Sequence, residues 1–211
     1  MTEPILNDKF TYQDKPLSDR LEKYEWDRMW IEDTTDKDSK RILYIGASTS
    51  AKIFPHATEA SGRSIIFNSF ATSKALDNPY YYPAVKSFIE QCDRRDAIIL
   101  QNGLHGWHLT EEEYGELYFE LMRAIKEDFP GVPVFVALTT AVSESAFNSH
   151  RVLPRNEQTR LAAERADVEV IDLYSVALEN LELLSSDGLH FTDEGYRRLG
   201  VALYTFLHER I

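Results

Sequence analysis

Short apolar runs recur along the chain from residue 41 onward, separated by longer segments of mixed polarity. They predict β-strands over residues 41–45, 64–67, 97–101, 132–138 and 168–171. Most of these runs are continuous and do not alternate between apolar and polar positions. Continuous apolar runs are typical of strands buried on both faces of a parallel sheet, so we expect helices on both sides.

The intervening segments place apolar residues at helical spacing. They predict helices over residues 83–92, 110–129, 156–166 and 192–209. The helix over 110–129 has clear limits, because Thr110 can cap its start, three glutamates follow, and Pro130 comes directly after its end. Strand and helix alternate about five times, which predicts a three-layer α/β/α domain with a central parallel sheet of about five strands.

The first 40 residues are more polar than the rest of the chain. A helix-like patch near residues 17–30 carries Leu21, Tyr24 and Trp30. We interpret residues 1–40 as an N-terminal extension packed on one domain that spans 41–211. At 211 residues and 43% hydrophobic composition, the chain is long enough for one substantial core, and no linker or repeat divides it.

The formal net charge of −12 argues against two classes of partner. Nonspecific binding to nucleic acid and attraction to an anionic membrane both depend on clustered Lys and Arg, and the chain has no basic patch. No apolar run approaches the ~18 residues of a membrane-spanning helix. The chain begins without the apolar segment of a signal peptide, so we expect a cytoplasmic protein, although a trimmed signal would leave no trace.

Potential metal ligands are few. Cys92 is the single cysteine, which excludes an internal disulfide and a cysteine-rich metal site. His105 and His108 are three residues apart, but no third ligand lies nearby in the sequence and the His-Glu-x-x-His pattern is absent. We therefore expect no metal site.

Polar segments follow the predicted strands at their carboxyl ends. Ser48, Asn68, residues 102–108 and the loop after Leu138 all lie there. Ligands of doubly wound folds bind beyond this end of the strands. The sequence therefore predicts one site at which these four segments meet.

Ser48, Asp187 and His190 form a candidate nucleophilic triad. Ser48 follows the first predicted strand and Gly46, which would permit a sharp turn, whereas Asp187 and His190 precede the last predicted helix. A serine hydroxyl needs an imidazole to remove its proton, and the imidazole needs a carboxylate to fix its tautomer. Alone, Ser48 could simply cap a helix, and the other two could be a surface pair before a helix that Thr192 caps. Taken together, the three residues favour the triad.

The stretch after the second predicted strand is a candidate source of donors for an oxyanion. Asn68, Ser69 and Ala71 belong to it, and a backbone N–H of a small-residue loop could serve there. The same composition is equally typical of a plain turn.

The run after the third predicted strand offers side-chain donors. Asn102 and His105 flank Gly103, which would let the backbone approach a ligand closely. The following loop, residues 139–155, carries Arg151 and Arg155. These arginines could attract a carboxylate or could pair with neighbouring acids, and the sequence leaves both possibilities open.

These segments resemble the four sequence blocks of the SGNH (GDSL-type) hydrolases over residues 41–211. Gly46-Ala47-Ser48 resembles the Gly-Asp-Ser of the first block, and Asp187-Gly-Leu-His190 matches the Asp-x-x-His of the last. The third block, Gly-x-Asn-Asp, is altered to Gly103-Leu104-His105-Gly106, with His105 in the asparagine position. The second block falls near residues 68–71, where its glycine is missing.

The resemblance implies a flavodoxin-like α/β/α fold and a serine esterase without a cofactor. Ser48 would attack the ester, His190 would be general base and then acid, and Asp187 would orient His190. The oxyanion would be stabilised by the N–H of Ser48, the backbone around Ser69 and Ala71, and His105 or Asn102 beside Gly103. The implied substrate is a small acyl ester, such as an acetylated carbohydrate.

Two other classes of function remain open from the sequence. The missing glycine of the second block and Ala47 in the first are also compatible with a catalytically silent, carbohydrate-binding or scaffolding protein of the same fold. A nucleotide-binding domain ranks last, because both Gly-x-Gly-x-x-Gly and the P-loop pattern are absent.

Overall fold

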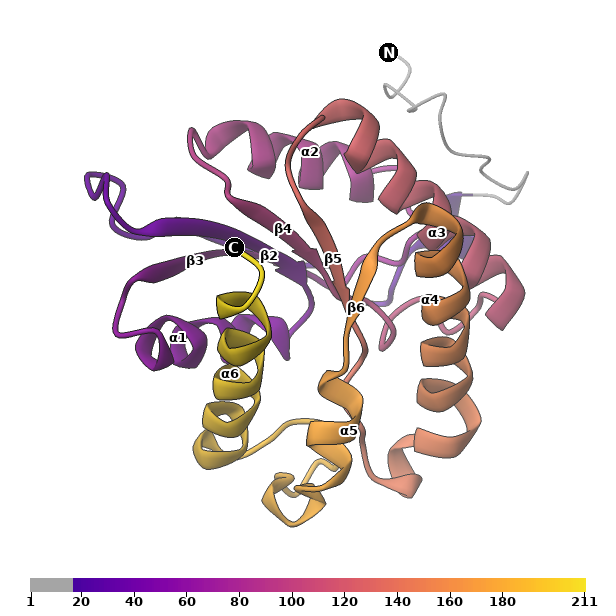
Figure 1. The fold of residues 1–211 in the computed structure, drawn as a ribbon. Helices are drawn as coiled ribbons and strands as arrows, with labels where there is room; N and C mark the ends of the chain where they lie inside the picture. Colours follow the sequence, from indigo (N-terminus) through magenta and orange to yellow (C-terminus); the bar gives the residue numbers. More distant parts are fainter. Residues whose placement is uncertain (1–16) are drawn as a thin grey trace.

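A six-stranded sheet forms the centre of the protein, and the computed structural model describes it within residues 17–211 (Figure 1). Its spatial order is β1-β3-β2-β4-β5-β6. The strands are β1 (Asp27–Trp30), β2 (Lys40–Gly46), β3 (Ile65–Thr72), β4 (Ala97–Leu100), β5 (Val134–Ala137) and β6 (Glu169–Ile171). Strands β2 to β6 pair in parallel, which confirms the predicted parallel sheet, and β1 adds an antiparallel edge.

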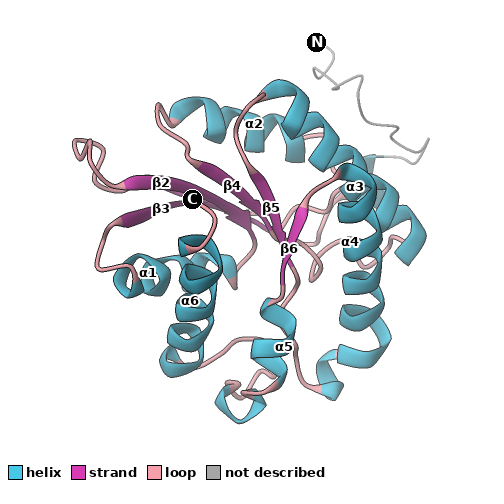
Figure 2. Ribbon diagram, in the orientation of Figure 1, coloured by secondary structure: helices cyan, strands magenta, loops and turns pink. Residues whose placement is uncertain are grey.

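Helices cover both faces of this sheet (Figures 1 and 2). The main helices are α1 (Ser50–Ala60), α2 (Tyr81–Gln91), α3 (Glu111–Asp128), α4 (Leu153–Ala166), α5 (Leu173–Leu178) and α6 (Asp193–His208). Short turns of other helix types span Leu17–Arg20, Glu144–Ala146, Asn148–Val152 and Leu181–Leu183. Side chains of α1, α5 and α6 pack on one face, and those of α2, α3 and α4 pack on the other. The predicted three-layer architecture is confirmed.

Strand β2 shows why its sequence is a continuous apolar run. Leu43 and Ile45 face the α2/α3 side, whereas Ile42 and Tyr44 face the α1/α6 side, and all four are fully buried. Side chains of a strand alternate between faces, so a central strand with helices on both sides must be apolar throughout.

The start of α3 has the predicted cap. The Thr110 hydroxyl accepts from the Glu113 N–H at 3.2 Å, and the Glu113 carboxylate accepts from the Thr110 N–H at 2.8 Å. This reciprocal capping box satisfies two donors that the first helical turn would otherwise leave unpaired.

The prediction of helical structure near residues 17–30 is wrong. The segment contains one short turn, Leu17–Arg20, followed by the edge strand β1. Strand β1 pairs with β3 from Asp27↔Thr72 to Trp30↔Ser69. The backbone bonds offered by the open edge of β3 outweigh the weak local helical spacing, which only the tertiary structure reveals. The part of the predicted extension before residue 17 lies outside the described residues.

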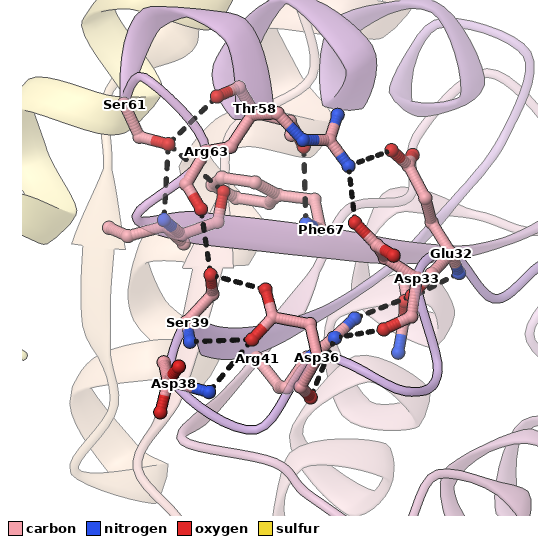
Figure 3. A network of polar contacts seen from close by, with 12 residues as sticks. Glu32, Asp33, Asp36, Asp38, Ser39, Arg41, Thr58, Ser61, Arg63 and Phe67 are labelled. Carbon is pink, nitrogen blue, oxygen red and sulfur yellow. Dashed lines mark hydrogen bonds and ion pairs between the residues drawn. The ribbon is translucent and has the colours of Figure 1, made fainter.

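The link from β1 to β2 is fastened at the amino end of the sheet (Figure 3). Arg41, buried at the start of β2, donates to the carbonyl oxygens of Glu32 and Asp33 at 2.5 Å each. Arg63 binds the carboxylates of the same two residues at 2.7 and 3.0 Å. These contacts hold the edge strand in place at the end of the sheet opposite to Ser48.

Candidate active site

Ser48 lies in the tight connection between β2 and α1, where it is half-buried. A Cβ on Gly46 would come within 2.5 Å of the Ser50 hydroxyl and 3.1 Å of the Gln101 carbonyl oxygen, so only glycine fits. The Ser50 hydroxyl in turn donates to the Ala47 carbonyl at 2.8 Å. The glycine is needed for close packing, and the connection that carries Ser48 is held rigidly.

Asp187 and His190 lie in a short turn before α6. The Asp187 Oδ1 accepts from the N–H groups of Leu189 and His190 at 2.8 and 2.9 Å and from the Ser185 hydroxyl at 2.8 Å. Gly188 has φ +69°, and a Cβ there would lie 2.2 Å from the Ser143 hydroxyl. The turn therefore fixes the carboxylate through several donors and requires glycine at its second position.

The structure brings the three predicted triad residues together, although Ser48 and His190 are 142 positions apart. The His190 Nδ1 lies 2.7 Å from the Asp187 Oδ2, and the Nε2 lies 2.8 Å from the Ser48 Oγ. With a proton on Nδ1, the ring donates to the carboxylate and can accept the serine proton at Nε2. The arrangement is that of a nucleophile, a base and a group that orients the base.

The electrostatics of the turn keep the carboxylate charged. Hydrogen bonds from the His190 N–H, the His190 ring and the Leu189 N–H hold the pKa of Asp187 far below its usual range. The His190 and Asp187 side chains are 38% and 47% exposed, so a substrate can reach this pair from solvent.

The prediction that Ser69 and Ala71 lie in a loop is wrong, because both residues lie inside β3. They pair with Tyr44 and Gly46 of β2 on one side and with Trp30 and Arg28 of β1 on the other. The backbone of a strand with two neighbours is used by the ladder, so these residues do not form a loop with free donors. Strand β3 extends five residues beyond the predicted end at 67, because β1 pairs with that part of it.

Asn68 is also inside β3, and its side chain is remote from Ser48. It accepts from the Glu32 N–H at 3.1 Å and approaches the Cys92 sulfur at 3.7 Å. These contacts border a cavity of about 340 Å³ at the amino end of the sheet. The residues that line it are Ile31, Thr34, Asp36, Lys37, Arg41, Asn68, Gln91, Cys92, Asp93 and Arg94.

Asn102 and Gly103 follow β4 and are buried. The Asn102 carbonyl accepts from the Tyr114 hydroxyl at 2.6 Å and the Thr139 hydroxyl at 2.7 Å, and its side chain hydrogen-bonds Tyr81. Tyr81 belongs to the α2/α3 side of the core, whereas Ser48 begins the connection to α1 on the other side. A Cβ on Gly103 would meet the Thr139 hydroxyl at 2.1 Å, so this position too requires glycine.

His105 lies against the N-terminal segment. Its Nδ1 is 3.8 Å from the Glu22 carboxylate, and its ring meets Trp26 edge-on with centroids 6.5 Å apart. Burial lowers the pKa of His105, and the nearby Arg155 lowers it further against the opposing effect of Glu22. The imidazole is thereby biased toward its neutral form.

Both arginines of the 139–155 loop pair with an acid, which answers the question that the sequence left open. Arg151 and Arg155 bind the two carboxylate oxygens of Glu111 at 2.8 and 3.1 Å. Arg155 is fully buried and also donates to three backbone carbonyls of residues 103–106.

Three further residues make contacts at this end of the sheet that no sequence pattern predicted. Glu22 accepts from the Gly106 N–H at 2.7 Å. Trp26 exchanges hydrogen bonds with Ser73 just beyond β3, and Asp77 binds His108 at 2.9 Å. Each contact joins segments that are far apart in sequence, so no local pattern could have identified it.

Two other kinds of feature, a metal site and a membrane-spanning helix, are absent from residues 17–211. No group of three or more His, Cys, Asp or Glu residues in this part of the chain is arranged to hold a metal ion. Within the same residues, no helix is both long enough and apolar enough to cross a membrane.

Known structures share this fold. No family model matches the sequence, and no curated protein matches it. A lipolytic protein of the G-D-S-L family from Veillonella parvula has a TM-score of 0.64 at 18% identity, covering 82% of this chain and all of the other. The carbohydrate acetylesterase Est24 from Sinorhizobium meliloti has a TM-score of 0.60 at 13% identity, with 82% and 100% covered. The acetyl xylan esterase AlAXEase has a TM-score of 0.62 at 15% identity, with 79% and 99% covered.

At such low identities the likeness is one of fold. The chain has the three-layer fold of the SGNH hydrolases, and the resemblance predicted from its motifs is confirmed at that level.

Proposed function

We propose that the protein is a serine esterase in which Ser48 is the nucleophile. The observation that carries the proposal is the continuous chain of hydrogen bonds from Asp187 through His190 to Ser48, with distances of 2.7 and 2.8 Å. A hydroxyl in contact with a properly oriented imidazole is the arrangement that activates serine for attack on an ester carbonyl.

The hydrogen bonds from Ser48 to His190 and from His190 to Asp187 indicate how the proton moves during the reaction. His190 takes the Ser48 proton as the Oγ bonds to the carbonyl carbon, and it then gives that proton to the departing alcohol as the ester C–O bond breaks. Water attacks the acyl-enzyme, loses a proton to His190 and releases the acid, and the proton returns to Ser48. Asp187 stays ionised and stabilises the imidazolium in both halves.

The start of α1 is a source of oxyanion stabilisation. Thr49 is the N-cap of this helix, and Ser48 lies immediately before it. The first N–H groups of a helix have no partner within the helix itself, and the helix dipole favours negative charge there. In the first turn of α1, the N–H groups of Ala51 and Lys52 already donate to the carbonyl oxygens of Ala47 and Thr49 at 3.2 and 3.0 Å. The N–H of Ser48, just before the helix, is therefore the donor placed to hold the developing charge.

We infer that the substrate is a small acyl ester, and an acetylated carbohydrate fits best. Two proteins of similar fold are described as a carbohydrate acetylesterase and an acetyl xylan esterase. Trp26 is 39% exposed and contacts His105, and an aromatic face of this kind can stack on a sugar ring.

Chemical labelling tests the nucleophile. A fluorophosphonate probe should label the wild-type protein at Ser48, and Ser48→Ala should abolish both labelling and the hydrolysis of p-nitrophenyl acetate. Equal hydrolysis by the two proteins would eliminate Ser48 as the nucleophile. An unlabelled, inactive wild type would favour the catalytically silent alternative.

A pair of tryptophans tests the substrate class. Trp26→Ala should raise the KM for an acetylated xylo-oligosaccharide about five- to tenfold and leave that for p-nitrophenyl acetate nearly unchanged. Trp30, which is 49% exposed at the end of β1 and pairs with the middle of β3, is the matched control. Equal effects of Trp26→Ala and Trp30→Ala would contradict a sugar platform at Trp26.

A further inference from the structure

Loop 103–106, the altered third block, is held by one buried side chain. The Arg155 guanidinium donates to the carbonyl oxygens of Gly103, His105 and Gly106 at 3.1, 2.5 and 2.6 Å. It is fully buried and is anchored to Glu111 at 3.1 Å. One guanidinium thus binds three backbone carbonyl oxygens of the same loop, and these hydrogen bonds fix the directions in which the three carbonyl groups point.

The direction of one peptide follows from this contact. In a trans peptide the C=O and the following N–H point in opposite directions. The Gly103 carbonyl points to Arg155, which lies on the α3/α4 side beside Tyr114 with its guanidinium 4.8 Å from that ring. The N–H of Leu104 therefore points away from Arg155 and from the α3/α4 side on which Arg155 lies.

Two neighbouring peptide groups have other partners. The Gly106 N–H donates to the Glu22 carboxylate at 2.7 Å, and the Leu104 carbonyl accepts from the Trp107 indole. Within residues 17–211, no hydrogen bond described for this loop uses the Leu104 N–H. This donor is thus oriented and available.

The strand register places the loop level with the nucleophile. Ile45 of β2 is opposite Leu100 of β4. Ser48 is three residues beyond Ile45, and Gly103 is three residues beyond Leu100. The close approach of Gly46 to the Gln101 carbonyl shows that the two chains are still adjacent one residue beyond that pair.

We propose that Arg155 is a positioning residue that aims the Leu104 N–H into the oxyanion hole. The inference rests on the proposed esterase function and deepens it. The Leu104 N–H would donate to the oxyanion in place of the backbone of residues 68–71, because those residues are inside the sheet. Arg155 itself touches no substrate and acts through loop 103–106.

Two substitutions at position 104 test the donor directly. Leu104→Pro removes the N–H, whereas Leu104→Ala keeps it. Loss of one oxyanion donor costs roughly 10²–10³ in kcat, so we expect that loss for Leu104→Pro and a change of less than about fivefold for Leu104→Ala. Equal kcat values for the two variants, each shown to be folded by circular dichroism, would overturn the proposal.

Substitution of Arg155 tests the positioning role. Arg155→Lys keeps the charge but lacks the planar fork, and we expect its kcat to fall at least tenfold with little change in KM. Arg165→Met is the matched control, because Arg165 also joins α4 to a glutamate of α3, Glu116, but on the exposed surface. Arg165→Met should stay within twofold of wild type.

A thionoester distinguishes catalysis from simple destabilisation. Sulfur accepts hydrogen bonds poorly, so an intact oxyanion hole favours the oxygen ester over its C=S analogue. The oxygen-to-sulfur rate ratio should fall about tenfold or more in Arg155→Lys and Leu104→Pro and stay unchanged in Arg165→Met. An unchanged ratio in folded Arg155→Lys would leave Arg155 with a structural role only. A wild type that is neither active nor labelled at Ser48 would instead refute the esterase proposal.

Discussion

Two histidines at the carboxyl end of the same sheet hydrogen-bond an aspartate side chain. In one pair, His190 binds the exposed Asp187, and its second nitrogen contacts Ser48. In the other, the Nε2 of His108 binds both carboxylate oxygens of Asp77 at 3.0 and 2.9 Å. Among residues 17–211 no hydrogen bond joins the remaining nitrogen of His108 to a hydroxyl. Only the first pair has the contact with a hydroxyl that the proposed reaction requires.

The two pairs also differ in what holds them. Asp187 is 47% exposed and is fixed by the hydrogen bonds of its turn, whereas the Asp77 side chain is only 5% exposed and is held by burial. A buried carboxylate loses hydration, and its partner is needed for stability. A His–Asp pair is therefore not a catalytic site by itself. Its role depends on whether a hydroxyl group contacts the second nitrogen of the imidazole.

The two histidines provide the largest expected contrast. His190→Ala should lower kcat for p-nitrophenyl acetate by about 10⁴-fold or more, because the general base is lost. His108→Ala should leave kcat within about threefold of wild type. Steady-state kinetics on both variants check this, and a comparable loss in His108→Ala would place the second pair in the mechanism.

The two carboxylates separate catalysis from stability. Asp187→Asn should lower kcat by about 10³–10⁴-fold, because the amide no longer fixes the reactive tautomer, with little change in unfolding free energy. Asp77→Asn should keep kcat and lose about 1.5–3 kcal/mol of stability, because a buried charged hydrogen bond is broken. Urea unfolding and kinetics on both variants measure the two effects. A stable Asp77→Asn protein with low activity would reverse these assignments.

A smaller effect is expected from the turn that holds Asp187. Ser185→Ala removes one donor to Oδ1 and leaves the N–H groups of Leu189 and His190 in place. We therefore expect kcat to fall only a few-fold, with KM unchanged. A loss as large as that of Asp187→Asn would mean that the backbone donors alone cannot position the carboxylate.

The smallest effect concerns a third imidazole, His105, whose folded-state pKa is lowered by burial. On acidification the unfolded chain takes up a proton at this residue before the folded chain does, so stability falls as pH drops through the ordinary histidine range. Urea unfolding of wild type should lose more free energy between pH 7 and 5.5 than that of His105→Asn. Parallel pH dependences would show that His105 does not contribute.

Local patterns predicted most elements of the sheet and its helices. Continuous apolar runs marked β2, β4 and β5, and the capping residues of α3 marked its start. Helix α1 carries Pro55 inside it, and Pro weakens the helical pattern, so α1 was not predicted as a full helix. Strand β1 was misassigned because its main determinant is the open edge of a distant strand.

The sequence by itself determined the parallel sheet, the sharp turn that Gly46 permits before Ser48, and the identity of Ser48, Asp187 and His190 as candidates. Each depends on short-range periodicity or on a compact motif. Only the tertiary structure decided that these three side chains meet, that Ser69 and Ala71 lie inside a strand, and that Arg155 holds loop 103–106. Such contacts depend on the register and packing of segments far apart in the chain, which no local pattern encodes.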